Sequence, residues 1–345
     1  RRISLTHNTN GAGWRPLPTP GWAVEPLSLS LFNIGRTASI HEKRRVVGKN
    51  NLLLFAGGRP LLVADSYVQG NNWSNFTRAG NLGSYRITGI VRLKDQRLMA
   101  LTHDDGRFIS GDPRSPELRK SAIYKMYSSD DGVTWSAPEL ALRHNLCGLY
   151  DAAVIRMPYY RNSLVMICAD RQNHCSFVSV SYDEGATWSY PSELPPYLTG
   201  DRFSLLVKGN RLTLVYRDMW RTGKEKALPE NPFFGDLVMW TGELKWLIEW
   251  RRDEMAATPY AEEADVPRRT NGIKFRIADN YPVAGADPAD RRSYDCGYPT
   301  ILSPRAGIFF VVACGYWDGD PAAATYVKSF MIEGYQLKQA RKALR

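Results

Sequence analysis

Short apolar stretches separated by polar turns run along most of the chain. Four stretches form similar pairs of apolar segments, each pair joined by a polar turn: Gly89 to Leu101, Ala153 to Cys168, Ser204 to Tyr216, and Thr300 to Cys314. Runs of this length, rich in β-branched and aliphatic residues and bounded by turn residues, are typical of β-strands. The pattern therefore predicts an all-β protein made of hairpins, with Leu52 to Ala64 as a further strand pair.

The hairpins recur at roughly regular spacing. From Ile90 to Val154, to Leu206 and to Ile301, the intervals are 64, 52 and 95 residues, and we interpret the last interval as about two repeats. We therefore assign segment 233–250 to an additional blade within this interval, one that lacks the turn motif seen at 128–135 and 181–188. Repeats of this size built from short strands are typical of propeller blades.

These intervals set the expected domain organisation. At about 50 residues per repeat, the 345 residues allow six blades and an extension. We expect an all-β, six-bladed β-propeller of four-stranded antiparallel blades over residues 51–332. Residues 1–50 are expected to be an N-terminal extension that packs on the propeller, and residues 333–345 a basic C-terminal tail.

One turn motif occurs twice. The segment SSDDGVTW at 128–135 recurs as SYDEGATW at 181–188, with identical Ser, Asp, Gly, Thr and Trp at matching offsets. Ser and Asp side chains bond nearby backbone amides, Gly takes a conformation that other residues avoid, and Trp packs between sheets. This motif is the Asp-box (BNR repeat), and it predicts structure more than activity.

Composition and charge narrow the classes of partner. The formal net charge of +10 favours an anionic partner, and aromatic residues at 12% suit both packing and the faces of sugar rings. Nucleic-acid binding rests on charge alone and is not expected. No apolar run approaches the roughly 20 residues that span a bilayer, so we expect no membrane span.

The sequence predicts no metal or cofactor. The five cysteines show no CxxC spacing, and no Gly-rich phosphate signature follows a strand.

The chain starts at Arg1 without Met or a signal-peptide pattern, which suggests a trimmed or mature form of a secreted or periplasmic protein. The oligomeric state is not predicted.

Polar residues gather at the predicted strand ends, where a propeller brings distant parts of the chain together. These positions are rich in Arg, Asp and Tyr, among them Arg86, Asp151, Asp201, Arg217 and Tyr298. Guanidinium groups bind carboxylates in a bidentate manner, and a carboxyl group can protonate a leaving oxygen. The set therefore suits an acidic sugar.

Several motifs extend this pattern to a known family. The segment 85–91 is similar to the Arg-Ile-Pro motif of sialidases, with Thr88 in place of Pro. Together with the two Asp-boxes, residues 85–330 resemble the sialidase/neuraminidase superfamily, and most of all a divergent branch of bacterial sialidase-like glycosidases. The segments that carry this similarity are HDDGRF at 103–108, TGDR at 199–202, YRD at 216–218, GDLVMWTG at 235–242 and DCGYP at 295–299.

The resemblance implies a mechanism without a cofactor. Sialidases use three arginines on the substrate carboxylate, a tyrosine nucleophile with an acidic partner, and an aspartic acid/base, and are exceptions to the two-carboxylate scheme. It implies that Tyr298 is the nucleophile and Arg86 and Arg217 are triad arginines. Arg276 is chosen as the third over Arg268 and Arg269. Substrate contacts are expected from Arg86, Asp104, Arg107, Arg202, Arg217, Arg276 and Asp295.

The chain departs from the family at the acidic residues. Arg202 lies near the position where sialidases keep the glutamate that activates the tyrosine, so Asp201 or Asp295 would have to replace it. Asp104, Asp105 and Asp112 compete for the acid/base role. We therefore expect an exo-acting glycoside hydrolase that cleaves a terminal acidic sugar with retention, and the alternative is a non-catalytic Asp-box propeller that binds glycans or proteins.

Overall fold

The computed structural model describes most of the strands of the chain. The described residues are 5–7, 15–17, 28–35, 51–66, 72–109, 120–170, 175–220, 233–249, 272–281, 298–317, 326–334 and 336–337. They fall into two compact units, Arg1–Tyr150 and Asp151–Arg345. Arg1–Tyr150 is called unit 1, and Asp151–Arg345 is called unit 2.

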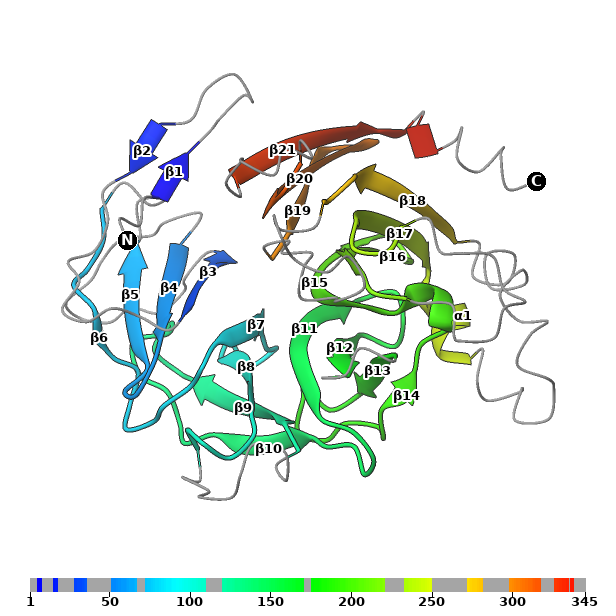
Figure 1. Ribbon diagram of the computed structural model, residues 1–345. Helices are drawn as coiled ribbons and strands as arrows, with labels where there is room; N and C mark the ends of the chain where they lie inside the picture. The colour runs from blue at the N-terminus through cyan, green and yellow to red at the C-terminus, as the bar shows by residue number, and fades with distance from the viewer. Residues whose placement is uncertain are drawn as a thin grey trace. The chain divides into compact units, whose positions relative to one another are not determined.

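Unit 1 contains a short hairpin and two four-stranded sheets (Figure 1). The hairpin pairs β1 (Leu5–His7) with β2 (Arg15–Leu17). The first sheet has the order β3-β4-β5-β6 and the second the order β10-β9-β8-β7, so strands adjacent in sequence are adjacent in the sheet. The strands are β3 (Ser28–Gly35), β4 (Asn51–Gly57), β5 (Leu62–Ser66), β6 (Thr77–Arg78), β7 (Ile87–Arg92), β8 (Leu98–Asp104), β9 (Ala122–Ser128) and β10 (Glu139–Leu142).

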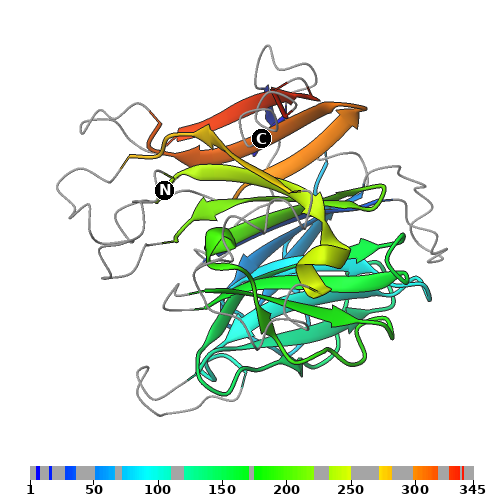
Figure 2. The ribbon, with the colours of Figure 1, turned by 90° about the vertical axis from the view of Figure 1, so that its right-hand side faces the viewer.

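Unit 2 contains three sheets of the same kind, β11-β12-β13-β14, β15-β16-β17-β18 and β19-β20-β21. The short helix α1 (Leu244–Glu249) follows directly on β17, and Figure 2 shows it in yellow-green. The strands are β11 (Leu149–Met157), β12 (Ser163–Asp170), β13 (Ser176–Ser181), β14 (Ser192–Glu193), β15 (Gly200–Lys208), β16 (Arg211–Asp218), β17 (Leu237–Glu243), β18 (Ile273–Ala278), β19 (Thr300–Arg305), β20 (Ile308–Gly315) and β21 (Tyr326–Glu333).

The prediction of six blades is wrong. The fold is all-β and built of antiparallel β-propeller blades, but the described residues form five of them, two in unit 1 and three in unit 2. The error comes from the 95-residue interval, which holds one sheet, β15–β18, with long connections after β16 and after α1. Segment 233–250 contributes β17 to that same sheet. Residues inserted between strands lengthen a repeat without adding a blade.

The predicted hairpins are confirmed at the level of strand pairing. The pairs β7–β8, β15–β16 and β19–β20 are antiparallel with short turns, and β11 lies beside β12. The predicted pair 52–64 is β4–β5. The first sheet begins at β3, within the segment 1–50, because β3 pairs with β4 along most of its length.

The two box turns have the same hydrogen bonds. In the first, the Gly132 amide donates to Ser128 Oγ at 2.8 Å, and the Thr134 amide donates to Asp130 Oδ1 at 2.9 Å. The second repeats these distances with Gly185, Ser181, Thr187 and Asp183. Gly132 and Gly185 have φ of 94° and 82°, the left-handed region that glycine adopts at little cost.

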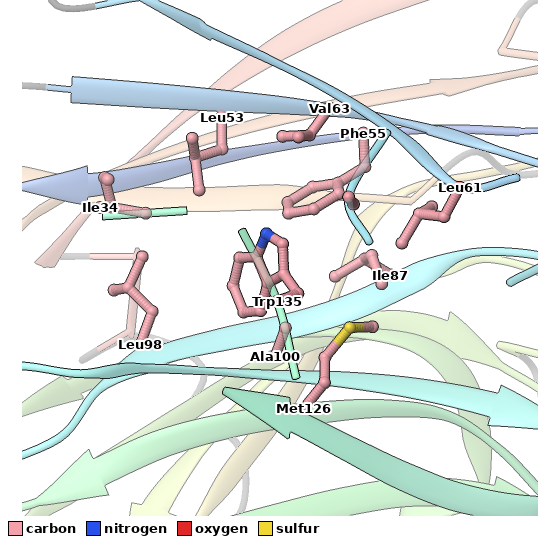
Figure 3. Close-up of a cluster of buried hydrophobic side chains, with 11 residues drawn as sticks. Ile34, Leu53, Phe55, Leu61, Val63, Ile87, Leu98, Ala100, Met126 and Trp135 are labelled. Carbon is pink, nitrogen blue, oxygen red and sulfur yellow. The ribbon is translucent and has the colours of Figure 1, made fainter. Parts of the chain in front are cut away.

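Trp135 ties the first box turn to the core of unit 1 (Figure 3). Its ring packs edge-on against Phe55 of β4, with centroids 5.6 Å apart, and its Nε1 donates to the Gly132 carbonyl at 3.0 Å. Side chains from both sheets of unit 1, such as Leu53 and Ile87, are buried in the same cluster. The motif therefore joins two blades through an aromatic side chain.

The last two sheets of unit 2 share a second apolar core. Val215, Leu237 and Met239 from sheet β15–β18 pack with Val311, Trp317 and other side chains of sheet β19–β21. Alternate residues of β20 are buried, as the two-residue period of a strand requires. This core joins the two sheets within unit 2.

Candidate functional site

Tyr298 and Asp151 form the most distinctive polar contact of unit 2. The Tyr298 hydroxyl donates to the Asp151 carboxylate, with oxygen distances of 3.0 Å to Oδ1 and 3.1 Å to Oδ2. Asp151 is 5% exposed, whereas Tyr298 is 36% exposed. The phenol thus reaches solvent while its proton points at a buried carboxylate.

Two residues of this region have left-handed backbone conformations. Asp151 has φ of 51° and Arg202 has φ of 58°. Non-glycine residues adopt this region at a cost and cluster at functional sites. In β15 the conformation accompanies a register shift between Asp201 and Ser204.

Arg202 supplies a positive charge beside the phenol. Its guanidinium carbon lies 5.3 Å from the centroid of the Tyr298 ring. A cation at this range is attracted to the face of an aromatic ring. Arg202 therefore lies against the ring of Tyr298, the predicted nucleophile.

Asp201 and Arg217 form a buried ion pair across the β15–β16 ladder. Arg217 Nε donates to Asp201 Oδ1 at 2.8 Å and Nη2 to Oδ2 at 2.5 Å, and both side chains are less than a tenth exposed. This bidentate geometry is the same that an arginine offers to a substrate carboxylate. In this structure the Asp201 carboxylate occupies the position on Arg217 that a substrate carboxylate would take.

Gly200 of the TGDR segment is required by packing. A Cβ there would lie 2.3 Å from Cδ2 of the Tyr216 ring and 2.4 Å from the Arg217 carbonyl oxygen. The Ser176 hydroxyl donates to the Gly200 carbonyl, and the Gly200 amide donates to Ser176 Oγ, both at 2.9 Å. These contacts fix the backbone that carries Asp201 and Arg202.

Arg276, the predicted third arginine, binds two carboxylates. Its Nε contacts Asp236 Oδ2 at 2.7 Å, and its Nη1 contacts Asp279 Oδ1 at 2.8 Å. Burial raises the pKa of Asp236 to about 6, against the opposing effects of the Asn280 amide and the Arg276 charge.

Two other tyrosines of unit 2 are unsuited to act as nucleophiles. Burial, with the Asp218 charge as a second cause, raises the pKa of both Tyr197 and Tyr216. The Lys274 ammonium ion pairs with Asp218 and donates to the Tyr197 carbonyl at 2.7 Å. Because Tyr216, Asp218 and Lys274 are buried, we assign this cluster a structural role.

In unit 1, the predicted aspartates differ in their surroundings. Asp104 accepts the backbone amides of Gly106, Phe108 and Ile109 at 2.9 to 3.2 Å, so its carboxylate holds the loop after β8. Asp105 is 7% exposed, and its Oδ1 accepts Arg107 Nε at 2.8 Å.

Arg86 precedes β7, and its carbonyl accepts the Thr102 hydroxyl at 2.7 Å. Aromatic rings lie near these residues. Tyr85 neighbours His103 and Phe108, with centroids 6.2 and 6.4 Å apart, and His103 neighbours Tyr150 at 6.0 Å. Tyr85 is 41% exposed.

The structure brings together some predicted residues and leaves others untested. Tyr298 and Arg202 are in contact, and Asp201 contacts Arg217. Asp112 and Asp295 lie outside the described residues. Sequence reasoning did not select Asp151 as the partner of Tyr298, although its place at the start of a predicted strand was a signal.

Among the described residues, no helix is long and apolar enough to cross a membrane. Within the same ranges, no group of three or more His, Cys, Asp or Glu side chains is arranged to hold a metal ion.

Comparison with known proteins shows the fold. No protein-family model matches the sequence, and no curated protein matches it. A protein of unknown function from Dyadobacter fermentans aligns over 96% of this chain and 83% of its own, at 12% identity and a TM-score of 0.61. The exo-β-1,3-galactanase of Phanerochaete chrysosporium, solved with β-1,3-galactotriose, aligns over 97% of this chain and 65% of its own, at 10% identity and a TM-score of 0.51.

A more distant match is the intramolecular trans-sialidase from Ruminococcus gnavus in complex with oseltamivir carboxylate. It has 13% identity and a TM-score of 0.48, and covers 83% of this chain and 51% of its own. This chain thus spans about half of the trans-sialidase and about two thirds of the galactanase. At these identities the similarity concerns the fold.

Proposed function

We propose that the protein is an exo-acting glycoside hydrolase that cleaves a terminal acidic sugar with retention of configuration. The observation that carries the proposal is the contact of the half-exposed Tyr298 phenol with the buried Asp151 carboxylate. The net charge of +10 favours an acidic substrate. One protein of similar fold, the exo-β-1,3-galactanase, acts by its name on a glycan.

The chemistry proceeds in two steps. A phenol with an ordinary pKa near 10 is a weak nucleophile, so it needs a base and a nearby cation. Tyr298 Oη attacks the anomeric carbon, Asp151 takes the phenolic proton, and the leaving oxygen receives a proton from a general acid. In the second step the carboxylate left by the general acid takes a proton from water, the water oxygen displaces Tyr298 from the anomeric carbon, and Asp151 returns its proton to the phenolate.

The other roles come from the sequence. Asp105 or Asp112 is proposed as the general acid, and Arg86 and Arg276 as ligands of the substrate carboxylate. Arg202 is proposed to stabilise the phenolate through its position beside the Tyr298 ring. Because Asp201 already engages Arg217 in a bidentate pair, we assign these two residues to positioning of the β15 start.

Substitution of the tyrosine tests the proposal. On a panel of aryl glycosides of sialic and uronic acids, Tyr298→Phe is expected to lower kcat by roughly 10⁴-fold or more while ligand binding is kept. Asp151→Asn is expected to lower kcat by about 10²- to 10⁴-fold, as loss of a general base does. Tyr159→Phe is the matched control, since Tyr159 is 73% exposed and has no part in the proposed chemistry.

The stereochemistry and the general acid need separate measurements. Proton NMR of the first-formed product is expected to show the configuration of the substrate. Asp105→Asn, or Asp112→Asn, is expected to slow substrates with poor leaving groups far more than activated aryl glycosides. Failure of the unchanged protein to release sugar from any substrate of the panel, or a kcat in Tyr298→Phe equal to that of the unchanged protein, would overturn the proposal.

The second candidate is a non-catalytic glycan-binding propeller. The observation that favours it is the Asp201–Arg217 pair, which occupies an arginine that the resemblance assigns to the substrate. Glycan binding without any hydrolysis, unaffected by Tyr298→Phe, would support this candidate.

A further inference from the structure

Unit 1 contains a cavity of about 570 Å³ lined mainly by turns and loops of its two sheets. Its volume lies within the roughly 300–1,000 Å³ of sites that bind small molecules. Residues from the turn after β4, the loop before β7 and the loop after β8 contribute to its walls. Among the side chains that line the cavity are Arg59, Arg78, Asn81, Leu82, Phe108 and Pro138.

Backbone hydrogen bonds hold two walls of this cavity together. The Gly58 amide donates to the Ser84 carbonyl at 2.8 Å, and the Ser84 amide donates back to Gly58 at 3.0 Å. The Leu61 amide donates to the Leu82 carbonyl at 2.9 Å. The cavity is therefore formed before any ligand arrives, which lowers the entropic cost of binding.

Arg59 is an exposed residue that lines the cavity and is anchored to its wall. Its Nη2 donates to the Phe108 carbonyl at 3.0 Å. Its aliphatic stem lies against Gly83, where an added Cβ would be 3.1 Å from Arg59 Cγ. A guanidinium has five N–H donors, and this contact uses one, so the anchored group retains donors for a ligand.

The charge of the lining selects the ligand. Of the described residues that line the cavity, two are arginines, Arg59 and Arg78, and none is an Asp or a Glu. Within the described part of the chain, neither arginine forms an ion pair with a carboxylate. Two cations without a compensating acid favour an anion.

The rest of the lining fits a sugar ring better than a bare anion. Asn81 offers an amide that both donates and accepts, which suits hydroxyl groups. Leu82, Phe108 and Pro138 present apolar surface, which suits the C–H face of a pyranose ring. The lining therefore suits a ligand that has one carboxylate, several hydroxyl groups and an apolar face.

We propose that this cavity binds a uronic acid residue of an acidic glycan, with its carboxylate on Arg59 and Arg78. The site belongs to unit 1, whereas Tyr298 and Asp151 belong to unit 2. The proposal does not depend on hydrolysis, because it concerns binding alone.

Calorimetric titration with glucuronate tests the proposal, with glucose and glucuronamide as neutral counterparts. Glucuronate is expected to bind and the neutral sugars to bind at least tenfold more weakly. Arg59→Gln and Arg78→Gln are each expected to weaken glucuronate binding by roughly ten- to hundredfold, as loss of a charge-assisted bond does. Arg59→Lys keeps the charge and is expected to fall between Arg59→Gln and the unchanged protein.

Arg143→Gln is the matched control, since Arg143 is an exposed arginine of unit 1 outside the cavity lining. The titrations are repeated in Tyr298→Phe, where cavity binding is expected to be unchanged. A crystal soaked with glucuronate is expected to show the carboxylate between Arg59 and Arg78.

Three results would each overturn the proposal. They are undetectable glucuronate binding, affinity unchanged in both Arg→Gln variants, and binding of glucose as tight as that of glucuronate. Equal binding of sulfate and glucuronate would also refute it, because the cavity would then recognise any small anion. Circular dichroism of each variant checks that the fold is kept.

Discussion

Burial and hydrogen bonding compete at Asp236. Its carboxylate is nearly buried, accepts the Asn280 amide at 2.8 Å, and contacts Arg276. Burial prevails and raises the pKa from 3.8 to about 6. Between these values the folded protein holds a proton that the unfolded chain has lost, so stability falls as pH rises through this window and levels off above it.

Asp236→Asn is expected to remove this pH dependence. At 1.36 kcal/mol per pKa unit, the shift corresponds to about 3 kcal/mol of stability lost between pH 4 and pH 6.5. Urea midpoints of the unchanged protein and the variant at several pH values measure the difference. Asp279→Asn, which alters an exposed carboxyl that also contacts Arg276, is expected to keep the pH dependence.

Tyr298 and Asp151 illustrate which site residues a sequence reveals. Tyr298 stands in a motif of five consecutive residues, so it could be predicted from the resemblance. Its partner Asp151 is 147 residues away in sequence, and no local pattern links the two. Asp201 is predicted as a substitute acid, whereas in the structure it forms an ion pair with Arg217 on the adjacent strand.

At the scale of the element, the box turn is a self-contained network. Burial alone would raise the pKa of Asp183, but hydrogen bonds from the Thr187 hydroxyl, the Thr187 amide and the Ser181 hydroxyl outweigh it and lower the pKa. A lowered carboxyl pKa means that the stabilisation is present above the unfolded value of 3.8 and is lost as pH falls below it.

Thr187→Val is expected to destabilise the protein by about 1 kcal/mol at pH 7, because it removes the hydroxyl bond to Asp183. Thr187→Ser, which keeps that hydroxyl, is expected to cost less. The difference should shrink below pH 3 as Asp183 becomes protonated. Urea unfolding of both variants at pH 7 and pH 3 measures it, and equal stabilities at pH 7 would contradict the assigned role of the turn.

The sheets themselves were largely predictable, and their grouping was not. Apolar stretches joined by polar turns predict the hairpins that correspond to β7–β8, β11–β12, β15–β16 and β19–β20. The prediction of a sixth blade was wrong because the interval between two hairpins includes the connecting segments as well as the strands. Only the pairing of β17 with both β16 and β18 shows that one sheet fills the longest interval.

At the scale of the whole molecule, the excess of positive charge has its own consequence. With a net charge of +10, the protein is expected to bind heparin at low salt and to elute well before 1 M NaCl. At that concentration the Debye length falls to about 3 Å, so diffuse attraction is screened. Retention beyond 1 M salt would instead indicate a specific polyanion or nucleic-acid site.

The sequence by itself determined the all-β class, the hairpins, the two box turns and the candidate tyrosine. These features depend on residues close together in the chain, where alternation and turn chemistry act locally. The tertiary structure decided the number of described blades, the pairing of Tyr298 with Asp151, and the cavity lined by Arg59 and Arg78. Those features depend on which distant segments the core packs together, and packing is set by many weak contacts that no short pattern records.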